Sequence, residues 1–413
     1  MDRRAFLKAG GVALFSMGAG PAFLNRSALA ASEPSPHVRR KILVTIFQRG
    51  AMDALAAVPP IADRELARLR PRLAMNGRDS GVTDLGNGFG LHPAFNDLLP
   101  LWQDERLAIV HAMGSPDATR SHFDAQDYME SGTPGRKGTR DGWLDRAVGE
   151  LGHEGRRSPF QAVAMTAALP RSFYGPNPAL AVTDLRDFRV RLPGKVAASA
   201  GQGFEALYEQ TSQELLRDTA HDTFEAMDTL EKLDVSRYRT SVNYPSSPLG
   251  RALRQIAFLV KSDVGLEVAF AESGGWDTHV QQGTSNGSFA RRANDLSRSI
   301  AAFWKDLGTY QDDVVVMTMT EFGRTVEENG SGGTDHGHGS CLFVLGNPVD
   351  GGKVHGRFPE SLSRDALYEG RDLPVTTDFR AIFAEVAGRQ LNIEDSANLF
   401  PGWNGKPLPL WRS

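Results

Sequence analysis

Cysteine is almost absent from this chain of 413 residues, in which Cys341 stands alone. A single thiol can form neither an intramolecular disulfide nor a thiolate metal cluster. No G-x-S-x-G, Walker A or G-x-G-x-x-G motif occurs in a strand–turn–helix setting. Enzymes built on a nucleophile elbow, a P-loop or a dinucleotide-binding turn are therefore not indicated.

Long hydrophobic runs are missing as well. The apolar stretch at residues 9–24 is interrupted by four glycines and one proline, and it is too short to span a membrane as a helix. It follows Arg3-Arg4-Ala5-Phe6-Leu7-Lys8, which resembles the twin-arginine export motif, and it precedes Ala28-Leu29-Ala30, an A-x-A cleavage signal. A disordered basic N-terminus is the alternative, but it does not account for the succession of a basic region, an apolar region and a cleavage signal that is typical of a signal peptide.

These features predict a twin-arginine signal peptide at residues 1–30, followed by a linker at 31–40. The partner of the signal would be the twin-arginine export machinery. The mature protein would be periplasmic or extracellular, with no transmembrane anchor. Because that machinery carries folded proteins, often with a cofactor already inserted, a bound metal is a natural expectation.

Positive charge is in deficit, with 46 Lys and Arg against 50 Asp and Glu and a net charge of −4. Because the first 30 residues hold four basic residues and one acidic residue, the mature chain carries 42 basic and 49 acidic residues, a net charge of −7. A mildly acidic chain without a basic tract argues against a nucleic-acid partner. Hydrophobic residues make up 40% of the sequence, which is ordinary for a soluble globular protein with a sizeable core.

Short β-branched runs alternate with helical patterns from residue 41 onward. Strands are predicted at residues 41–48, 107–113, 160–166, 179–183, 266–271, 313–319 and 341–345, and helices at 93–102, 121–130, 203–233, 248–261, 290–307 and 378–391. This alternation predicts an α/β fold with a mainly parallel central sheet flanked by helices on both faces, a three-layer sandwich. We expect one domain over residues 41–413, with an inserted or appended helical region near 201–235 that serves packing.

Acids and histidines follow several of the predicted strands. Asp53 follows the first strand, Asp277 and His279 follow the strand at 266–271, and Glu321 follows the strand at 313–319. In open α/β sheets, ligands bind beyond the carboxyl ends of the strands. We therefore predict one polar site at this edge of the sheet.

The segment SGGTDHGHGS at residues 331–340 places Asp335, His336 and His338 within four positions, among four glycines. Aspartate and neutral histidine are common metal ligands, and glycine permits tight turns. In an extended segment an H-x-H pair directs both imidazoles to one side. Asp335 is expected either to bind the metal or to hold one imidazole in its ligating tautomer. The alternative is a flexible, solvated loop.

Two further motifs follow predicted strands. In GGWDTH, Asp277 and His279 are two positions apart and could chelate one ion; alternatively, Asp277 caps a helix and His279 is solvated. In TEFGRT, Glu321 is a candidate ligand and Arg324 a candidate clamp for phosphate or sulfate, because guanidinium pairs with oxyanions in a bidentate way. The alternative is a buried Glu–Arg pair that stabilises the strand end.

The segment RSHFD at residues 120–124 precedes a predicted helix. Ser121 at the helix N-terminus is a candidate nucleophile, with Thr119 as a competitor. The pattern S-x-x-D also fits a capping box, in which Ser121 only satisfies the first backbone N–H groups. Further candidates to line the site are His122, Asp124 and Asp127.

Taken in chain order, these motifs resemble the bacterial domain-of-unknown-function family 1501. The blocks that carry the resemblance are RSHFDAQDYMESG (120–132), GGWDTH (274–279), VVVMTMTEFGRT (314–325), NGSGGTDHGHGS (329–340), TDFRAIFAEV (377–386) and LFPGW (399–403). The resemblance runs over nearly the whole mature chain. It implies a relation to the alkaline phosphatase and sulfatase superfamily, whose α/β sheet binds one or two metals through Asp and His at strand ends.

On this resemblance, Asp53 matches the early aspartate of the superfamily and Ser121 matches the nucleophile position at a helix N-terminus. Asp277 and His279 match the first Asp/His pair. Glu321 stands where the second pair begins, and the late histidine is matched by His336 or His338.

The expected function is therefore that of an exported, metal-dependent hydrolase acting on a small-molecule or polymer-borne phosphate or sulfate ester. A divalent zinc, manganese or calcium ion would polarise the ester, with Ser121 as nucleophile and Arg324 orienting the anion. The predicted metal ligands, direct or through a neighbour, are Asp53, Asp277, His279, Glu321, Asp335, His336 and His338. The alternative is a non-enzymatic periplasmic binding or assembly protein on a degenerate hydrolase scaffold. A redox partner is disfavoured by the lack of thiolate and haem motifs.

Overall fold

The computed structural model describes residues 39–75, 80–151, 158–187, 225–227, 229–230, 232–233 and 235–412. The predicted signal peptide, most of the linker and residues 201–224 of the predicted helical region lie outside these ranges. Within the described part of the chain, no helix is both long enough and apolar enough to cross a membrane.

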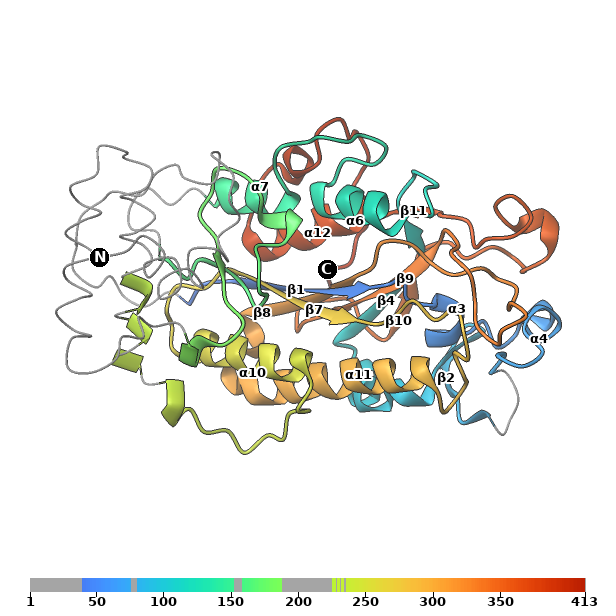
Figure 1. The fold of residues 1–413 in the computed structure, drawn as a ribbon, viewed down its shortest axis with the longest axis horizontal. Helices are drawn as coiled ribbons and strands as arrows, with labels where there is room; N and C mark the ends of the chain where they lie inside the picture. The colour runs from blue at the N-terminus through green and yellow to red at the C-terminus, as the bar shows by residue number, and fades with distance from the viewer. Residues whose placement is uncertain are drawn as a thin grey trace, which may run out of the picture.

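A sheet crosses the centre of the molecule (Figure 1). Its strands, among the described residues, follow the order β10-β4-β9-β8-β1-β7-β5-β6, and β11 pairs with the end of β4. They are β1 (Ile42–Arg49), β4 (Leu107–Gly114), β5 (Ala162–Ala164), β6 (Leu180–Ala181), β7 (Val268–Gly274), β8 (Val314–Met319), β9 (Ser340–Leu345), β10 (Lys353–His355) and β11 (Thr377–Asp378). A separate antiparallel hairpin consists of β2 (Thr83–Gly86) and β3 (Phe89–Leu91).

Strand direction decides which loops meet at the edge of the sheet. Every described strand pair in the sheet is parallel except the two formed by β9. Because β9 runs against β4 and β8, Ser340 at its beginning lies beside Met113 near the carboxyl end of β4. The mainly parallel sheet predicted from the sequence is confirmed, and its antiparallel strand brings the segment before Ser340 to the carboxyl edge.

Helices cover both faces of the sheet (Figure 1). One face carries α10 (Pro248–Lys261), α11 (Ser288–Leu307), α5 (Leu99–Gln103) and the 3-10 segment Pro93–Leu98. The other face carries α6 (His122–Ser131), α7 (Trp143–Glu150) and α12 (Phe379–Leu391). The short helices α3 (Ala54–Ala57) and α4 (Arg64–Leu69) follow β1.

Side chains along β1 alternate between the two faces of the sheet, and they pack into the hydrophobic core on each face. Val44 and Ile46 are buried in the same cluster as α10 and α11, whereas Leu43 and Phe47 are buried in the same cluster as α7 and α12. Successive strand residues point to opposite faces, so a continuous apolar run fills the two layers on either side. The predicted three-layer sandwich is confirmed.

Local signals explain where the helices begin and end. The α10 helix follows the capping Ser247 and has Pro248 at its first position, and its bounds coincide with the predicted 248–261. The α6 helix ends at Gly132, whose φ of 70° lies in the left-handed region that glycine favours. The α7 helix was not predicted, because eight residues that include Gly149 give too short a periodic signal.

Asp145 in α7 makes the packing of this layer sensitive to pH. Its carboxyl group is buried, its Oδ1 accepts the amide hydrogen of Asn177 at 2.8 Å, and its Oδ2 has no hydrogen-bond partner among the described residues. Burial raises the pKa of Asp145 from 3.8 to about 7. The folded state therefore holds a proton more tightly than the unfolded state, and the stability this contributes is lost as the pH rises from about 4 to about 7.

We predict that Asp145→Asn stabilises the protein by roughly 2–4 kcal/mol at about pH 8 and has little effect at about pH 4, because the amide keeps an acceptor for Asn177 without a charge. Urea denaturation at both pH values measures the effect. Asp350→Asn, next to Lys353 on the surface, is the control. An equal gain at both pH values would contradict a buried, proton-holding Asp145.

Candidate metal centre

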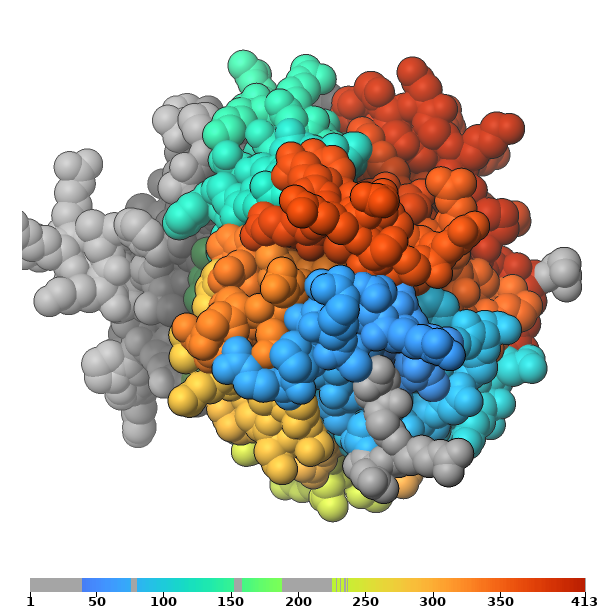
Figure 2. Space-filling view, turned by 90° about the vertical axis from the view of Figure 1, so that its right-hand side faces the viewer, coloured from blue at the N-terminus to red at the C-terminus, as the bar shows by residue number. Residues whose placement is uncertain are grey.

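The loops after β1, β7 and β8 and the start of α6 converge at the carboxyl edge of the sheet, the face shown in Figure 2. The loop after β1 comes so close to the loop after β7 that a Cβ on Gly50 would lie 2.5 Å from the backbone nitrogen of Asp277. Gly50 also has a φ of 115°, which glycine adopts without strain. Glycine at this position thus allows Asp277 to lie over the end of β1.

His122 is the first residue of α6, directly after Ser121. Its Nδ1 lies 2.8 Å from Oε1 of Glu321, a buried carboxylate just beyond β8. Because a carboxylate only accepts hydrogen bonds, Nδ1 carries the hydrogen, and in the neutral ring Nε2 holds a lone pair. That Nε2 is buried, has no hydrogen-bond partner within the described ranges, and lies 3.5 Å from Oδ2 of Asp277.

His336 and His279 repeat this arrangement. The Nδ1 of His336 lies 2.8 Å from the backbone oxygen of Arg120, and the Nδ1 of His279 lies 2.9 Å from Oδ1 of Asp335. Both acceptors fix the hydrogen on Nδ1 and leave Nε2 as the lone-pair nitrogen. The two Nε2 atoms are 2.9 Å apart, and they lie 3.4 Å and 3.0 Å from Oδ1 of Asp277.

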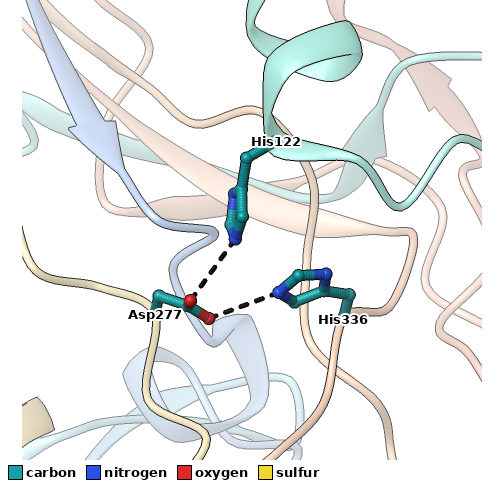
Figure 3. Close-up of side chains that lie close together, drawn as sticks. All are labelled: His122, Asp277 and His336. Carbon is teal, nitrogen blue, oxygen red and sulfur yellow. Dashed lines mark ion pairs between the residues drawn. The ribbon is translucent and has the colours of Figure 1, made fainter.

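The carboxylate of Asp277 faces the imidazoles of both His122 and His336 (Figure 3). The ligand atoms of His122, Asp277 and His336 all lie within 4.8 Å of one another, and His279 contacts the last two. Arg324, which is buried, donates from Nη1 to Oδ1 of Asp277 at 2.6 Å. Its Nη2 and Nε donate to the backbone oxygen and the hydroxyl of Thr334. The position of the carboxylate is thus fixed by a guanidinium that is itself held in place.

The charges around the centre keep its carboxylates ionised. Partial burial raises the pKa of Asp277, but the hydrogen bond and charge of Arg324 bring it below its ordinary value. Burial also opposes ionisation of Glu321, yet hydrogen bonds from His122 and Gln126 lower its pKa overall. The hydrogen bond to Glu321 raises the pKa of His122, whereas burial lowers the pKa of His336.

The resulting centre is rich in electron pairs and open on one side. Three imidazole lone pairs face one carboxylate, and two neutral Nε2 atoms 2.9 Å apart repel each other unless a proton or a cation lies with them. The side chains of Asp277 and His279 remain 42% and 38% exposed. A cluster of this kind can bind a cation and still admit a further ligand from solvent, unlike a closed structural site.

Glu321 and Asp335 contact the Nδ1 atoms of His122 and His279, the ring nitrogens that do not face Asp277. Glu321 accepts hydrogen bonds from His122, from Gln126 at 2.9 Å and from the backbone of Gly50 at 2.8 Å. Asp335 accepts from His279 and from Asn329. In the structure both carboxylates thus accept the Nδ1 hydrogen of an imidazole, which matches the tautomer-holding alternative given for Asp335; their direct binding of a metal stays a prediction.

Asp53 belongs to a different network. It is buried, caps α3, pairs with Arg70 at 2.7 Å and accepts a hydrogen bond from Gln282 at 2.6 Å. These partners occupy both carboxylate oxygens, and Asp53 is not part of the cluster of His122, Asp277 and His336. The strand-end position was correct, but it could not reveal that Arg70 would neutralise the charge.

The two histidines of the H-x-H pair separate. His336 points into the centre, whereas the Nε2 of His338 lies 2.9 Å from the backbone oxygen of Ser115 and its ring packs against Tyr368. Both imidazoles thus contact backbone oxygens of the loop at residues 115–120, but only His336 also reaches Asp277 and His279, and the chain bends at His338. Only His336 forms a bridge, with Arg324, and Gly337 lies so near Arg324 that a Cβ would be 2.4 Å from its backbone.

Ser121 and Arg324 have structural partners. The Oγ of Ser121 accepts the amide hydrogen of Asp124 at 3.5 Å, which is the capping alternative. Arg324 pairs with Asp277, so the Glu–Arg pair considered as an alternative is replaced by an Asp–Arg pair. The sequence predicts His122 only as a residue that lines the site, whereas in the structure its Nε2 faces Asp277. Its place directly after a capping serine, among strand-end acids, was the available signal.

Three solved structures are similar to this chain in the path of the backbone. Ps i-CgsB in complex with k-i-k-neocarrahexaose is 9% identical, with a TM-score of 0.36 over 87% of this chain and 74% of the other. The PsFucS1 sulfatase from Pseudoalteromonas sp. is 9% identical, with a TM-score of 0.36 over 89% and 73%. The PH0037 protein from Pyrococcus horikoshii is 10% identical, with a TM-score of 0.27 over 76% and 89%.

No curated protein matches the chain. A family model described as "Protein of unknown function (DUF1501)" matches residues 102–401, a range that contains His122, Asp277, His279 and His336. This match extends over more than half of the sequence and includes the blocks that carried the resemblance, except the last two residues of LFPGW. The chain therefore belongs to the DUF1501 family of proteins of unknown function.

Proposed function

We propose that this protein is a metal-dependent hydrolase of phosphate or sulfate esters. One observation carries the proposal. His122, His279 and His336 each have Nδ1 held by an oxygen acceptor, so that three Nε2 lone pairs meet at the carboxylate of Asp277. This is how proteins orient metal-binding imidazoles.

The donor set fits a divalent ion. His122, Asp277 and His336 would hold it, with His279 as a further ligand. Imidazole nitrogens with one carboxylate suit zinc or manganese better than calcium, which prefers an all-oxygen shell. When bound, such an ion acts as a Lewis acid toward an ester oxygen and makes water a better nucleophile near neutral pH.

The protein's own residues prepare the site for this chemistry. Arg324 fixes Asp277, Glu321 fixes His122, and Asp335 fixes His279. Preorganised groups need no rearrangement when charge develops on the substrate. The exposed sides of Asp277 and His279 leave room for the ester to approach. Because Ser121 caps α6, we propose that water, and not Ser121, attacks the ester.

We further propose that the protein acts outside the cytoplasm. The support is the arrangement of Arg3-Arg4, the apolar stretch at 9–24 and Ala28-Leu29-Ala30. Export of a folded protein is consistent with a site whose ligands come together only in the folded chain.

A second candidate function is a non-enzymatic binding or assembly protein that uses the metal centre for structure. It is favoured by the fact that Ser121 and Arg324, the two groups first expected to act on substrate, both serve the fold. This candidate predicts metal binding without turnover.

We predict that the purified protein binds zinc or manganese and that His122→Ala and His336→Ala each lose most of it, because each removes an Nε2 ligand. Elemental analysis after dialysis measures the metal content. His338→Ala is the matched control in the same loop and should retain the metal. Equal retention in all three variants would remove the basis of the site.

Asp335→Ala should weaken metal binding about 10- to 100-fold, because His279 would lose the acceptor that fixes its tautomer. Competition with a chromogenic chelator gives the affinity. Asp335 is half exposed, so the melting temperature of the metal-free protein should not change. Glu360→Ala removes an exposed carboxylate outside the cluster and should leave the affinity unaltered.

The hydrolase proposal is tested by assaying the metal-loaded protein on a panel of phosphate and sulfate esters. Turnover should disappear on chelation, return with added metal, and be absent in His336→Ala. Ser121→Ala should keep most of the activity and lose about 1 kcal/mol of stability as a missing cap. Metal binding without turnover on any ester would instead support the binding-protein candidate.

A further inference from the structure

A chain of buried polar side chains leads from the loop after β1 to the metal centre. Nε2 of Gln282 donates to Oδ2 of Asp53 at 2.6 Å, and the hydroxyl of Thr334 donates to Oε1 of Gln282 at 2.8 Å. The oxygen of that hydroxyl accepts from Nε of Arg324 at 3.3 Å, and Nη1 of Arg324 donates to Asp277 at 2.6 Å. The first four of these residues are buried. Asp53, which lies outside the centre, is thus connected to Asp277 by three side chains.

The charged groups in this chain fix the direction of its hydrogen bonds. A carboxylate only accepts, so Asp53 faces the amide nitrogen of Gln282 and the amide oxygen is turned toward Thr334. A guanidinium only donates, so the oxygen of Thr334 accepts from Arg324 while its hydrogen points to Gln282. The directions required at the two ends therefore agree. Buried networks in which every member is satisfied are rigid, whereas a broken one leaves polar groups unpaired.

Asp53 also holds the segment that follows Arg324. Arg70 pairs with Oδ2 of Asp53 at 2.7 Å and donates to the backbone oxygens of Thr325 and Val326, also at 2.7 Å. One carboxylate is therefore connected to the backbone next to Arg324 through Arg70 and to the guanidinium of Arg324 through the chain described above.

We propose that Asp53, Gln282 and Thr334 are positioning residues for the metal centre. They orient the guanidinium of Arg324, which in turn orients the carboxylate of Asp277. The inference rests on the metal binding of the proposed function, and it gives these buried groups a role in the affinity for the ion without contact with it. Because Nη2 of Arg324 also donates to the backbone oxygen of Thr334, loss of the hydroxyl loosens the guanidinium but does not release it.

Two threonines allow a matched test. Thr278 and Thr334 are both buried, and their hydroxyls donate to the same Oε1 of Gln282 at 2.7 Å and 2.8 Å. Within the described part of the chain, however, Nε of Arg324 donates to Thr334 and not to Thr278. Substitution of either threonine by valine removes one hydroxyl with little change in shape, so the two variants differ in whether Arg324 loses an acceptor.

The affinities for zinc and for manganese are measured by competition with a chromogenic chelator, and the stability of the metal-free proteins by urea denaturation. We expect Thr334→Val to bind the ion about 10-fold more weakly, because a group that supports a ligand is itself no longer held. Thr334→Ser should restore most of the affinity. Thr278→Val should lose stability but bind the ion as tightly as the native protein. Gln282→Met breaks the chain one residue further from Arg324 and should likewise weaken binding, which keeps the test valid if Thr334→Val does not fold.

The outcomes separate the positioning role from the hydrolase itself. Unchanged affinity in Thr334→Val and Gln282→Met, an equal loss in Thr278→Val, or a Thr334→Ser variant as weak as Thr334→Val would each overturn the inference and leave the metal centre of the native protein standing. Binding of neither ion by the native protein would contradict both proposals. The expected pattern of affinities without turnover of any ester would support the positioning role and contradict the hydrolase.

Discussion

The ion pair between Arg324 and Asp277 is the interaction on which the carboxyl edge of this sheet depends. Arg324 is buried, and its three guanidinium nitrogens are directed to Asp277 and Thr334. It thereby joins the loop after β7 to the loop between β8 and β9. A buried guanidinium without its carboxylate is costly, so the two loops cannot separate without exposing an unpaired charge.

A second layer of acceptors surrounds this pair. A buried carboxylate, a half-exposed carboxylate and a backbone carbonyl each take the Nδ1 hydrogen of one imidazole. These acceptors differ in charge and burial, which explains why burial lowers the pKa of His336 while Glu321 raises that of His122. The three rings therefore all turn Nε2 toward Asp277, but they differ in their electrostatic environment.

The sequence predicted the sheet well, because its strands are apolar runs separated by helical periods, and the strand ends correctly located Asp277, His279 and Glu321. The sequence could not predict which residues form ion pairs and hydrogen bonds with each other. Nothing local to Asp53 shows that Arg70 will pair with it, and nothing local to His338 shows that a bend will turn it toward Ser115. The antiparallel course of β9 was likewise invisible, since an apolar run carries no direction. Hydrogen-bond partners are set by tertiary contacts, which composition and spacing do not encode.

The residues of the centre come from distant parts of the chain. The Nδ1 of His336, for example, donates to the backbone oxygen of Arg120, 216 positions away in the sequence. In an unfolded chain these groups have no reason to meet, so a bound ion would stabilise only the folded state, by about 2.7 kcal/mol when its free concentration is 100 times the dissociation constant. Under the proposed export of the folded protein, the metal would be selected in the compartment in which the chain folds, and the ion would be carried from that metal pool to the destination.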